Sequence, residues 1–137
     1  MNKTYRWEIP KTFCEDESSK TNYSAWIRTF SEQLCYVFAK GLREKLGFTD
    51  DNYNFSQDDL EYAIEFDESE AVFVVNFGFE REEAGTLIFE VFINAIKLKK
   101  ILFFYRRSEP PKEVFEKFHD VVMTIAKENN ILLIEEA

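Results

Sequence analysis

The sequence has 137 residues, of which 45% are hydrophobic and 17% aromatic, and its net charge is −9. This length fits one domain, residues 1–137, and the apolar content excludes an intrinsically disordered chain. No apolar run reaches the roughly 18 residues that a membrane span needs, and no apolar leader segment opens the chain. We therefore expect a cytoplasmic protein with no membrane partner, whose Cys14 and Cys35 are reduced thiols.

The acidic charge is concentrated in one segment. Residues 50–90 contain 13 acids and a single base, Arg81, which gives a local net charge of −12. Residues 97–112 are locally basic, with six Lys or Arg residues against one acid, Glu109. A dense acidic surface disfavours nucleic acid, whose phosphates need clustered bases, and favours association with a basic partner.

The first predicted elements are an N-terminal arm and a long helix. Residues 1–20 are polar and aperiodic, and are expected to form an arm or a short edge strand around residues 5–9. Apolar residues then recur at three- and four-residue steps from Tyr23 to Leu46, which predicts an amphipathic helix. Asn22 or Ser24 is the expected N-cap, and Gly47 the C-cap. Gly41 lies near the apolar stripe, where it would permit the close approach of a strand.

The next segment, residues 49–59, is predicted to be an acidic surface loop. It resembles a calcium-binding loop of the EF-hand type, because carboxylate, amide and hydroxyl side chains occupy six of the ligand positions: Asp50, Asn52, Asn54, Ser56, Asp58 and Glu61. However, Phe55 replaces the glycine that the sharp turn of that loop requires. The following residues also alternate as in a strand, so the surface loop is the favoured interpretation.

Strands are predicted over most of residues 60–107. Residues 60–66 alternate between apolar and polar, residues 71–79 are apolar on both faces as in a central strand, and residues 86–94 follow a turn. Residues 95–107 also favour a strand, although no turn signal lies between 95 and 100, so one long bent strand is an alternative. The lysines from Lys97 to Lys100 are expected on the solvent side of that strand.

A second helix and a last strand complete the prediction. The helix opens at Ser108-Glu-Pro-Pro, carries an apolar stripe from Val114 to Ile125 and stops at Asn129-Asn130. Residues 131–134 form the final strand. The predicted fold class is α+β, a mostly antiparallel sheet of four to five strands with two amphipathic helices packed on one face, in the order α-β-β-β-β-α-β.

The sequence contains no recognisable catalytic or cofactor motif, so we expect no enzyme, cofactor or metal site. His119 is the only histidine and sits in an amphipathic pattern typical of a boundary position. Cys14, Cys35 and His119 lack zinc-ligand spacing, and the four glycines form no phosphate-binding loop. Six phenylalanines are expected in the core rather than around a ligand: Phe77, Phe79, Phe89, Phe92, Phe103 and Phe104.

These features favour a non-catalytic protein that binds a basic protein partner. The contacts are expected from two acidic turns, with side chains Asp67, Glu68, Glu70, Glu80, Glu82 and Glu83. By analogy of function, bacterial immunity proteins, which neutralise toxin nucleases, are small and acidic because carboxylates mimic the phosphate field that a nuclease binds. A secretion chaperone that binds an effector segment is one alternative. An enzyme or small-ligand binder with an unrecognised site between sheet and helices is the other.

Overall fold

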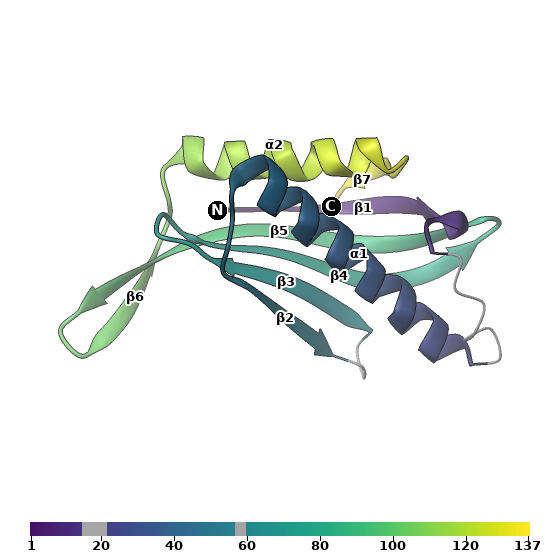
Figure 1. The fold of residues 1–137 in the computed structure, drawn as a ribbon, viewed down its shortest axis with the longest axis horizontal. Helices are drawn as coiled ribbons and strands as arrows, with labels where there is room; N and C mark the ends of the chain where they lie inside the picture. The colour runs from purple at the N-terminus through teal and green to yellow at the C-terminus, as the bar shows by residue number, and fades with distance from the viewer. Residues whose placement is uncertain (15–21, 57–59) are drawn as a thin grey trace.

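The computed structural model describes residues 1–14, 22–56 and 60–137, and shows an α+β fold with two helices on one face of an antiparallel sheet (Figure 1). The helices are α1 (Tyr23–Leu46) and α2 (Lys112–Glu128), and a short 3-10 turn, η1 (Lys11–Phe13), follows the first strand. The strands are β1 (Asn2–Pro10), β2 (Asp51–Ser56), β3 (Glu61–Asp67), β4 (Val72–Glu83), β5 (Thr86–Ile101), β6 (Phe104–Ser108) and β7 (Leu132–Glu136). In the described part of the chain, no helix is both long and apolar enough to cross a bilayer.

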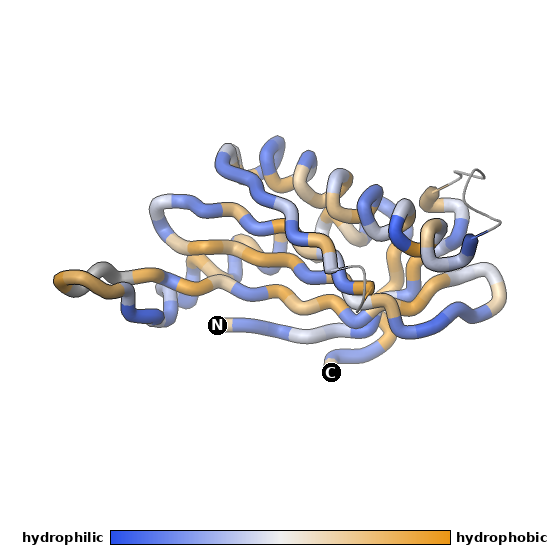
Figure 2. The backbone as a smooth tube through the Cα atoms, turned by 90° about the horizontal axis from the view of Figure 1, so that it is seen from below, coloured by the Kyte–Doolittle hydropathy of each residue, from blue (hydrophilic) through white to orange (hydrophobic). Residues whose placement is uncertain are grey.

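The strand order is β2-β3-β4-β5-β1-β7, with β6 paired to the far end of β5. Seen from below, both helices lie above the sheet and leave its other face uncovered (Figure 2). The fold class and the packing of both helices on one face were therefore predicted correctly. The predicted number of strands was too low, and the predicted order lacked both β1 and β2.

Both ends of α1 are fixed by the predicted caps. The side chain of Asn22 accepts a hydrogen bond from the backbone N–H of Ala25 at 3.1 Å. Gly47 has φ +70°, and its N–H donates to the carbonyl of Arg43 at 2.9 Å. A left-handed residue costs least at glycine, which lacks Cβ, so the helix ends where glycine stands.

The two helices approach closely at Gly41. A Cβ atom built on this residue would lie 2.6 Å from Cδ1 of Ile125, a buried residue of α2. The close approach predicted at Gly41 is therefore real, but the neighbour is a helix and not a strand. The apolar stripes of α1 and α2 share this contact, since both helices lie on the same face of the sheet.

A phenylalanine-rich core lies between the helices and the covered face of the sheet. Trp7 stacks on Phe38 with ring centroids 5.6 Å apart, and Phe30 stacks on Phe89 at 5.9 Å. Phe77 is fully buried and packs against Phe38. Each such ring removes a large apolar area from water, so the core is built by α1 together with β1, β4 and β5.

The N-terminal segment is not an arm or an edge strand, because β1 lies between β5 and β7 and pairs with both. Three of its alternate side chains, Tyr5, Trp7 and Ile9, are buried. The polar residues between them face the uncovered side of the sheet, so residues 5–9 alternate as in a strand whose one face is buried. The partners of β1 in β5 lie 76 to 92 positions further along the chain, so no local pattern reveals this pairing.

The predicted loop at residues 49–59 is also wrong, since residues 51–56 form the edge strand β2 and pair with β3. An extended strand directs Asn52 and Asn54 to one side of the sheet and cannot wrap them around an ion, so the calcium-loop resemblance fails over this stretch. Asp58 lies outside the described residues. Phe55 and Tyr53 pack their rings against each other and stabilise the edge position.

The segment from residue 95 to 107 is neither a separate strand nor one bent strand. Strand β5 continues to residue 101, the chain turns at Leu102 and Phe103, and β6 returns along β5. Leu102 has φ +55°, a conformation typical of such a tight turn although the residue is not glycine. Phe103 and Phe104 are exposed, contrary to the prediction that they belong to the core.

Candidate functional site

The six acidic residues predicted to bind a partner occupy the two opposite ends of β4. Asp67, Glu68 and Glu70 belong to the turn between β3 and β4, whereas Glu80, Glu82 and Glu83 lie at the hairpin between β4 and β5. The 12 residues of β4 separate them by about 35 to 40 Å. The two groups therefore form two distinct surfaces.

The acids of the β4–β5 hairpin are paired with bases of the same chain. Glu80 accepts hydrogen bonds from Arg6 at 3.0 Å, and Glu83 pairs with Arg81 at 3.0 Å. Lys11 donates to Glu82, and this contact lowers the pKa of the Glu82 carboxyl from its usual value. Local bases thus neutralise much of the charge of this hairpin.

The turn between β3 and β4 borders a cavity of about 440 Å³. The cavity lies where this turn, the C-terminal end of α1 and the first two turns of α2 meet, at the end of the molecule from which β6 extends (Figure 1). Eleven residues line it: Leu46, Gly47, Phe48, Glu68, Ser69, Glu70, Phe73, Glu113, Val114, Lys117 and Phe118. We call it the acidic cavity.

Three phenylalanines form an aromatic cluster in the acidic cavity. Phe48 stacks on Phe73 with centroids 4.8 Å apart, and Phe118 packs on Phe73 at the same distance. Phe73 and Phe118 are buried, while Phe48 is half-buried. The C-cap at Gly47 turns the chain so that Phe48, the next residue, reaches this cluster.

Carboxylates surround the aromatic cluster. Glu68 accepts a hydrogen bond from the backbone N–H of Thr49 at 2.7 Å, which holds its side chain beside the end of α1. Glu70 and Glu113 are exposed, and Lys117 is the single base in the lining. Acidic groups around aromatic rings suit a side chain with an apolar stem and a cationic head, because carboxylates and ring faces both attract cations.

Of the residues that line the acidic cavity, two were predicted from the sequence as partner-binding residues, and the others were not. Glu68 and Glu70 were identified from local charge density. Glu113 was missed because it precedes the apolar stripe of α2 by one residue, a position where an acid is ordinary at a helix N-terminus. The packing of Phe48 could have been predicted, because this residue follows a predicted helix C-cap, where an apolar residue often packs back on the helix.

His119 takes part in a bridge between α2 and β1 rather than in a cavity. Its Nε2 atom lies 2.5 Å from the hydroxyl of Tyr5, and its Nδ1 atom lies 3.2 Å from Oδ1 of Asp120. Burial raises the pKa of the Tyr5 hydroxyl from its usual value of 10.0. The half-buried position of His119 agrees with the boundary position that its sequence pattern predicted.

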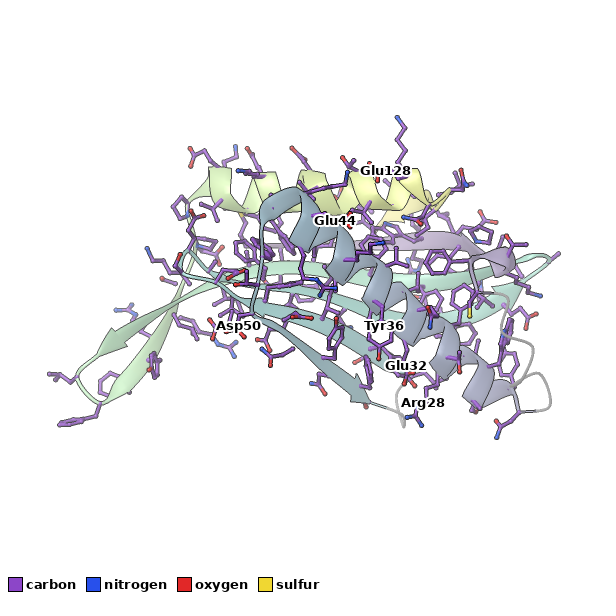
Figure 3. All side chains as sticks on the ribbon, viewed as in Figure 1. Arg28, Glu32, Tyr36, Glu44, Asp50 and Glu128 are labelled. Atoms are coloured by element: carbon purple, nitrogen blue, oxygen red, sulfur yellow. The ribbon has the colours of Figure 1, made fainter. Side chains whose placement is uncertain are left out.

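The solvent side of α1 carries charges that pair along the helix. Arg28 donates to Glu32 at 3.0 Å, and Tyr36 lies one turn further on (Figure 3). The ring of Tyr36 meets that of Tyr53 on β2 edge-on, with centroids 5.3 Å apart. This surface ties α1 to the edge strand, and its opposite charges compensate each other.

A second hollow, of about 530 Å³, lies on the uncovered side of the sheet beside the start of β1 and the end of β6. Phe92 and Ile96 supply apolar lining, and the N-terminal ammonium group pairs with Glu109 across it. Because this pair is neutral and Arg107 also lines the hollow, it lacks the acidic character of the first cavity.

Within residues 1–14, 22–56 and 60–137, no group of three or more Asp, Glu, His or Cys side chains is arranged to hold a metal ion. Both cysteines are free and buried. Comparison with known protein families, curated proteins and solved structures gives no match to this chain.

Proposed function

We propose that this chain is a non-catalytic binding protein that recognises a basic protein partner through the acidic cavity and the turn between β3 and β4. The particular role that we propose is that of an inhibitor of the immunity type, which neutralises a basic toxin such as a nuclease. The observation that carries the proposal is the placement of Glu68, Glu70 and Glu113 around an aromatic cluster with one lysine.

The energetics favour a lysine or arginine of the partner as the group that enters. A cation over an aromatic face gains about 0.5 to 2 kcal/mol, depending on how far it is desolvated. Exposed carboxylates add little affinity individually but accelerate encounter with a basic surface. Glu70 has no ion-pair partner within the described residues, so its charge is available to a partner, in contrast to that of Glu83.

The test measures binding to the proteins encoded next to this chain, because inhibitors of this type are produced beside the toxin that they neutralise. We expect a basic protein whose association rate falls steeply with salt and whose toxic activity the chain suppresses. Glu70→Lys should slow association about tenfold, since it reverses an unpaired charge at the cavity. Glu83→Lys is the matched control, because it makes the same charge change at the paired hairpin.

Two results would contradict the proposal. A tight partner whose affinity ignores salt would exclude electrostatic recognition. Equal slowing by Glu70→Lys and Glu83→Lys would show that the cavity has no special role and that only the net charge matters.

A second candidate, the chaperone-like capture of an extended segment, is favoured by one observation. Strand β7 is the outer strand next to β1, and Leu132, Leu133 and Ile134 are 62%, 49% and 46% exposed. An outer strand offers unpaired backbone groups to which an extended peptide can add as a further strand. In that case Ile134→Lys should weaken binding, Glu70→Lys should not, and the affinity should depend little on salt.

A further inference from the structure

The hairpin formed by the end of β5 and by β6 extends away from the rest of the fold (Figures 1 and 2). The hairpin exposes large apolar side chains along its length: Leu98 at 48%, Leu102 at 78%, Phe103 at 99%, Phe104 at 62% and Tyr105 at 66%. We call residues 102–105 the hairpin tip. Contiguous exposure of this kind is rare at a surface that faces only water, and indicates contact with another apolar phase or partner.

The part of the hairpin closer to the sheet, which we call the stem, is strongly basic. Residues 97–108 contain five Lys or Arg residues and no acid: Lys97, Lys99, Lys100, Arg106 and Arg107. The register sets Lys97 opposite Ser108, residue 99 opposite Arg106 and residue 100 opposite Tyr105, so the basic stem ends at the level of Tyr105. The hairpin is thus graded along its length, from a basic stem to an apolar tip, within a chain that is acidic elsewhere.

The tip is apolar on both of its faces. Phe104 and Tyr105 are successive residues of a strand, so their side chains point to opposite sides, and both are more than 60% exposed. Phe103, in the turn between the strands, is almost fully exposed. A groove on a protein would cover only one face of the tip, whereas the interior of an apolar medium would surround both faces.

Nucleic acid does not account for this composition. Single-stranded nucleic acid binds by stacking its bases on aromatic rings, but Leu98 and Leu102 offer no ring on which a base can stack. Insertion into an apolar medium uses branched aliphatic and aromatic side chains alike. The graded hairpin therefore fits a lipid bilayer with an anionic surface, in which bases meet the headgroups and the tip enters the acyl region.

Although the sequence predicted no membrane partner, we propose that this hairpin docks the protein on an anionic lipid bilayer by inserting residues 102–105. From Arg106 to Phe103 the chain spans three residues, about 10 Å, which matches the depth of 5 to 10 Å that interfacial segments reach. Beyond Arg106, β6 continues for only two residues, to Ser108, which is about 7 Å and close to the Debye length of about 8 Å at physiological salt. Repulsion between the acidic body and the membrane is therefore partly screened while the stem remains in contact. The site is separate from the acidic cavity.

The experiment measures sedimentation of the full chain with vesicles of phosphatidylcholine alone and of phosphatidylcholine mixed with phosphatidylserine. We expect binding to the mixed vesicles at physiological salt, at least about tenfold weaker binding to the neutral ones, and loss at high salt. In a Phe103→Trp variant, the new indole should shift its emission to the blue on binding. The native tryptophans are Trp7, which is fully buried, and Trp26, which is half-buried on α1, so the wild-type chain with the same vesicles gives the reference emission.

Two pairs of variants separate the tip and the stem from general effects. Phe103→Asp should lower vesicle affinity about tenfold or more, because it places a charge in the inserting turn. Leu132→Asp, at an exposed apolar residue of β7, is its control. Joint reversal of Arg106 and Arg107 to Glu should have a similar effect, whereas Lys40→Glu on α1 should not. These side chains are exposed, so the variants are expected to keep the fold, as thermal melting can verify.

Other outcomes would overturn the proposal. Failure to bind mixed vesicles, or binding that Phe103→Asp leaves unchanged, would exclude insertion of the tip. Concentration-dependent self-association that Phe103→Asp abolishes, without lipid binding, would identify the hairpin as an interface between protein chains. Binding to single-stranded nucleic acid in place of vesicles would assign the stem to phosphates of that kind.

Discussion

Gly41 shows how a single residue sets the distance between the two helices. A methyl group there would meet Cδ1 of Ile125 at 2.6 Å and Cγ1 at 2.9 Å. Overpacking of a core costs about 1 to 3 kcal/mol, while replacing glycine by alanine inside a helix returns about 1 kcal/mol. Ile125 is only 2% exposed and has little room to move, so we expect the overpacking to prevail.

We therefore predict that Gly41→Ala lowers the free energy of unfolding by about 1 to 2 kcal/mol in urea denaturation. Ile125→Val removes the closest atom, so the double variant Gly41→Ala, Ile125→Val should lose less than the sum of the two single variants. Strict additivity, or a stabilising Gly41→Ala, would show that the helices are free to separate at this point.

The ionisation of the Cys35 thiol makes the free energy of unfolding depend on pH in the alkaline range. Burial, followed in size by the nearby charge of Glu32, raises the pKa of this thiol to about 12 from an ordinary value of 9.0. In the unfolded chain the thiol therefore ionises about 3 pH units earlier than in the folded chain. Since the unfolded state loses its proton first, stability is complete below about pH 9 and falls as the pH rises toward 12.

The prediction is that between about pH 8 and pH 11 the wild-type free energy of unfolding falls by about 2 to 3 kcal/mol more than that of Cys35→Ala. The comparison with the variant is needed because burial also raises the pKa of Tyr5 and Tyr62, whose ionisation acts in the same direction. Parallel curves for the two proteins would mean that the thiol is accessible to water.

Residue-level features were predictable where they depend on neighbours in the chain. Asn22 and Gly47 were identified as caps because capping is decided within four residues. The acids of the two turns were visible as charge density, but their ion pairs were not, because Arg6 and Lys11 are more than 70 residues away from Glu80 and Glu82. The sequence thus located the acids without showing which of them are available to a partner.

Among the elements, β1 carries more of the stability than its position at the start of the chain suggests. Burial of Tyr5, Trp7 and Ile9 contributes about 1.5 to 3 kcal/mol for each side chain, or about 5 to 9 kcal/mol together. That is comparable with the whole stability of an ordinary domain. By contrast, all five residues of β7 are exposed.

We predict that deletion of residues 2–9 abolishes cooperative unfolding followed by circular dichroism. Deletion of residues 132–137 is the control, and should leave a folded protein with reduced stability because the buried Ile131 remains. A folded protein without residues 2–9 would mean that β7 can take the place of β1 beside β5.

Apolar periodicity predicted the long helices, and an apolar run on both faces predicted the central strand, because each pattern extends over many residues. Pattern failed for β2, none of whose residues is buried at the edge of the sheet, and for the β5–β6 hairpin. There, a run of apolar residues was assigned to the core since apolar residues usually lie inside. The phenylalanines of a core and those of an exposed tip are indistinguishable by hydropathy, so only the structure separates Phe77 from Phe103.

The whole molecule has two poles of opposite charge. Residues 97–108 carry five bases and no acid, although the chain as a whole has a net charge of −9. The electrostatic interaction between a charged surface and such a molecule depends on the Debye length, which is about 30 Å at 0.01 M salt, 10 Å at 0.1 M and 3 Å at 1 M. At about 0.01 M salt the charges of the acidic body and of the hairpin both interact with the surface, whereas at about 0.1 M only the charged groups nearest the surface interact with it.

We therefore predict that retention on a sulfonate exchanger at neutral pH is not monotonic in salt. The net negative charge should prevent binding at about 0.01 M, the hairpin should give weak retention near 0.1 M, and screening should remove it near 1 M. Reversal of Arg106 and Arg107 to Glu should eliminate the maximum, while Lys40→Glu should preserve it. Retention that falls steadily from the lowest salt would show that the two poles do not act separately, and would remove the electrostatic basis for an oriented approach to an anionic surface.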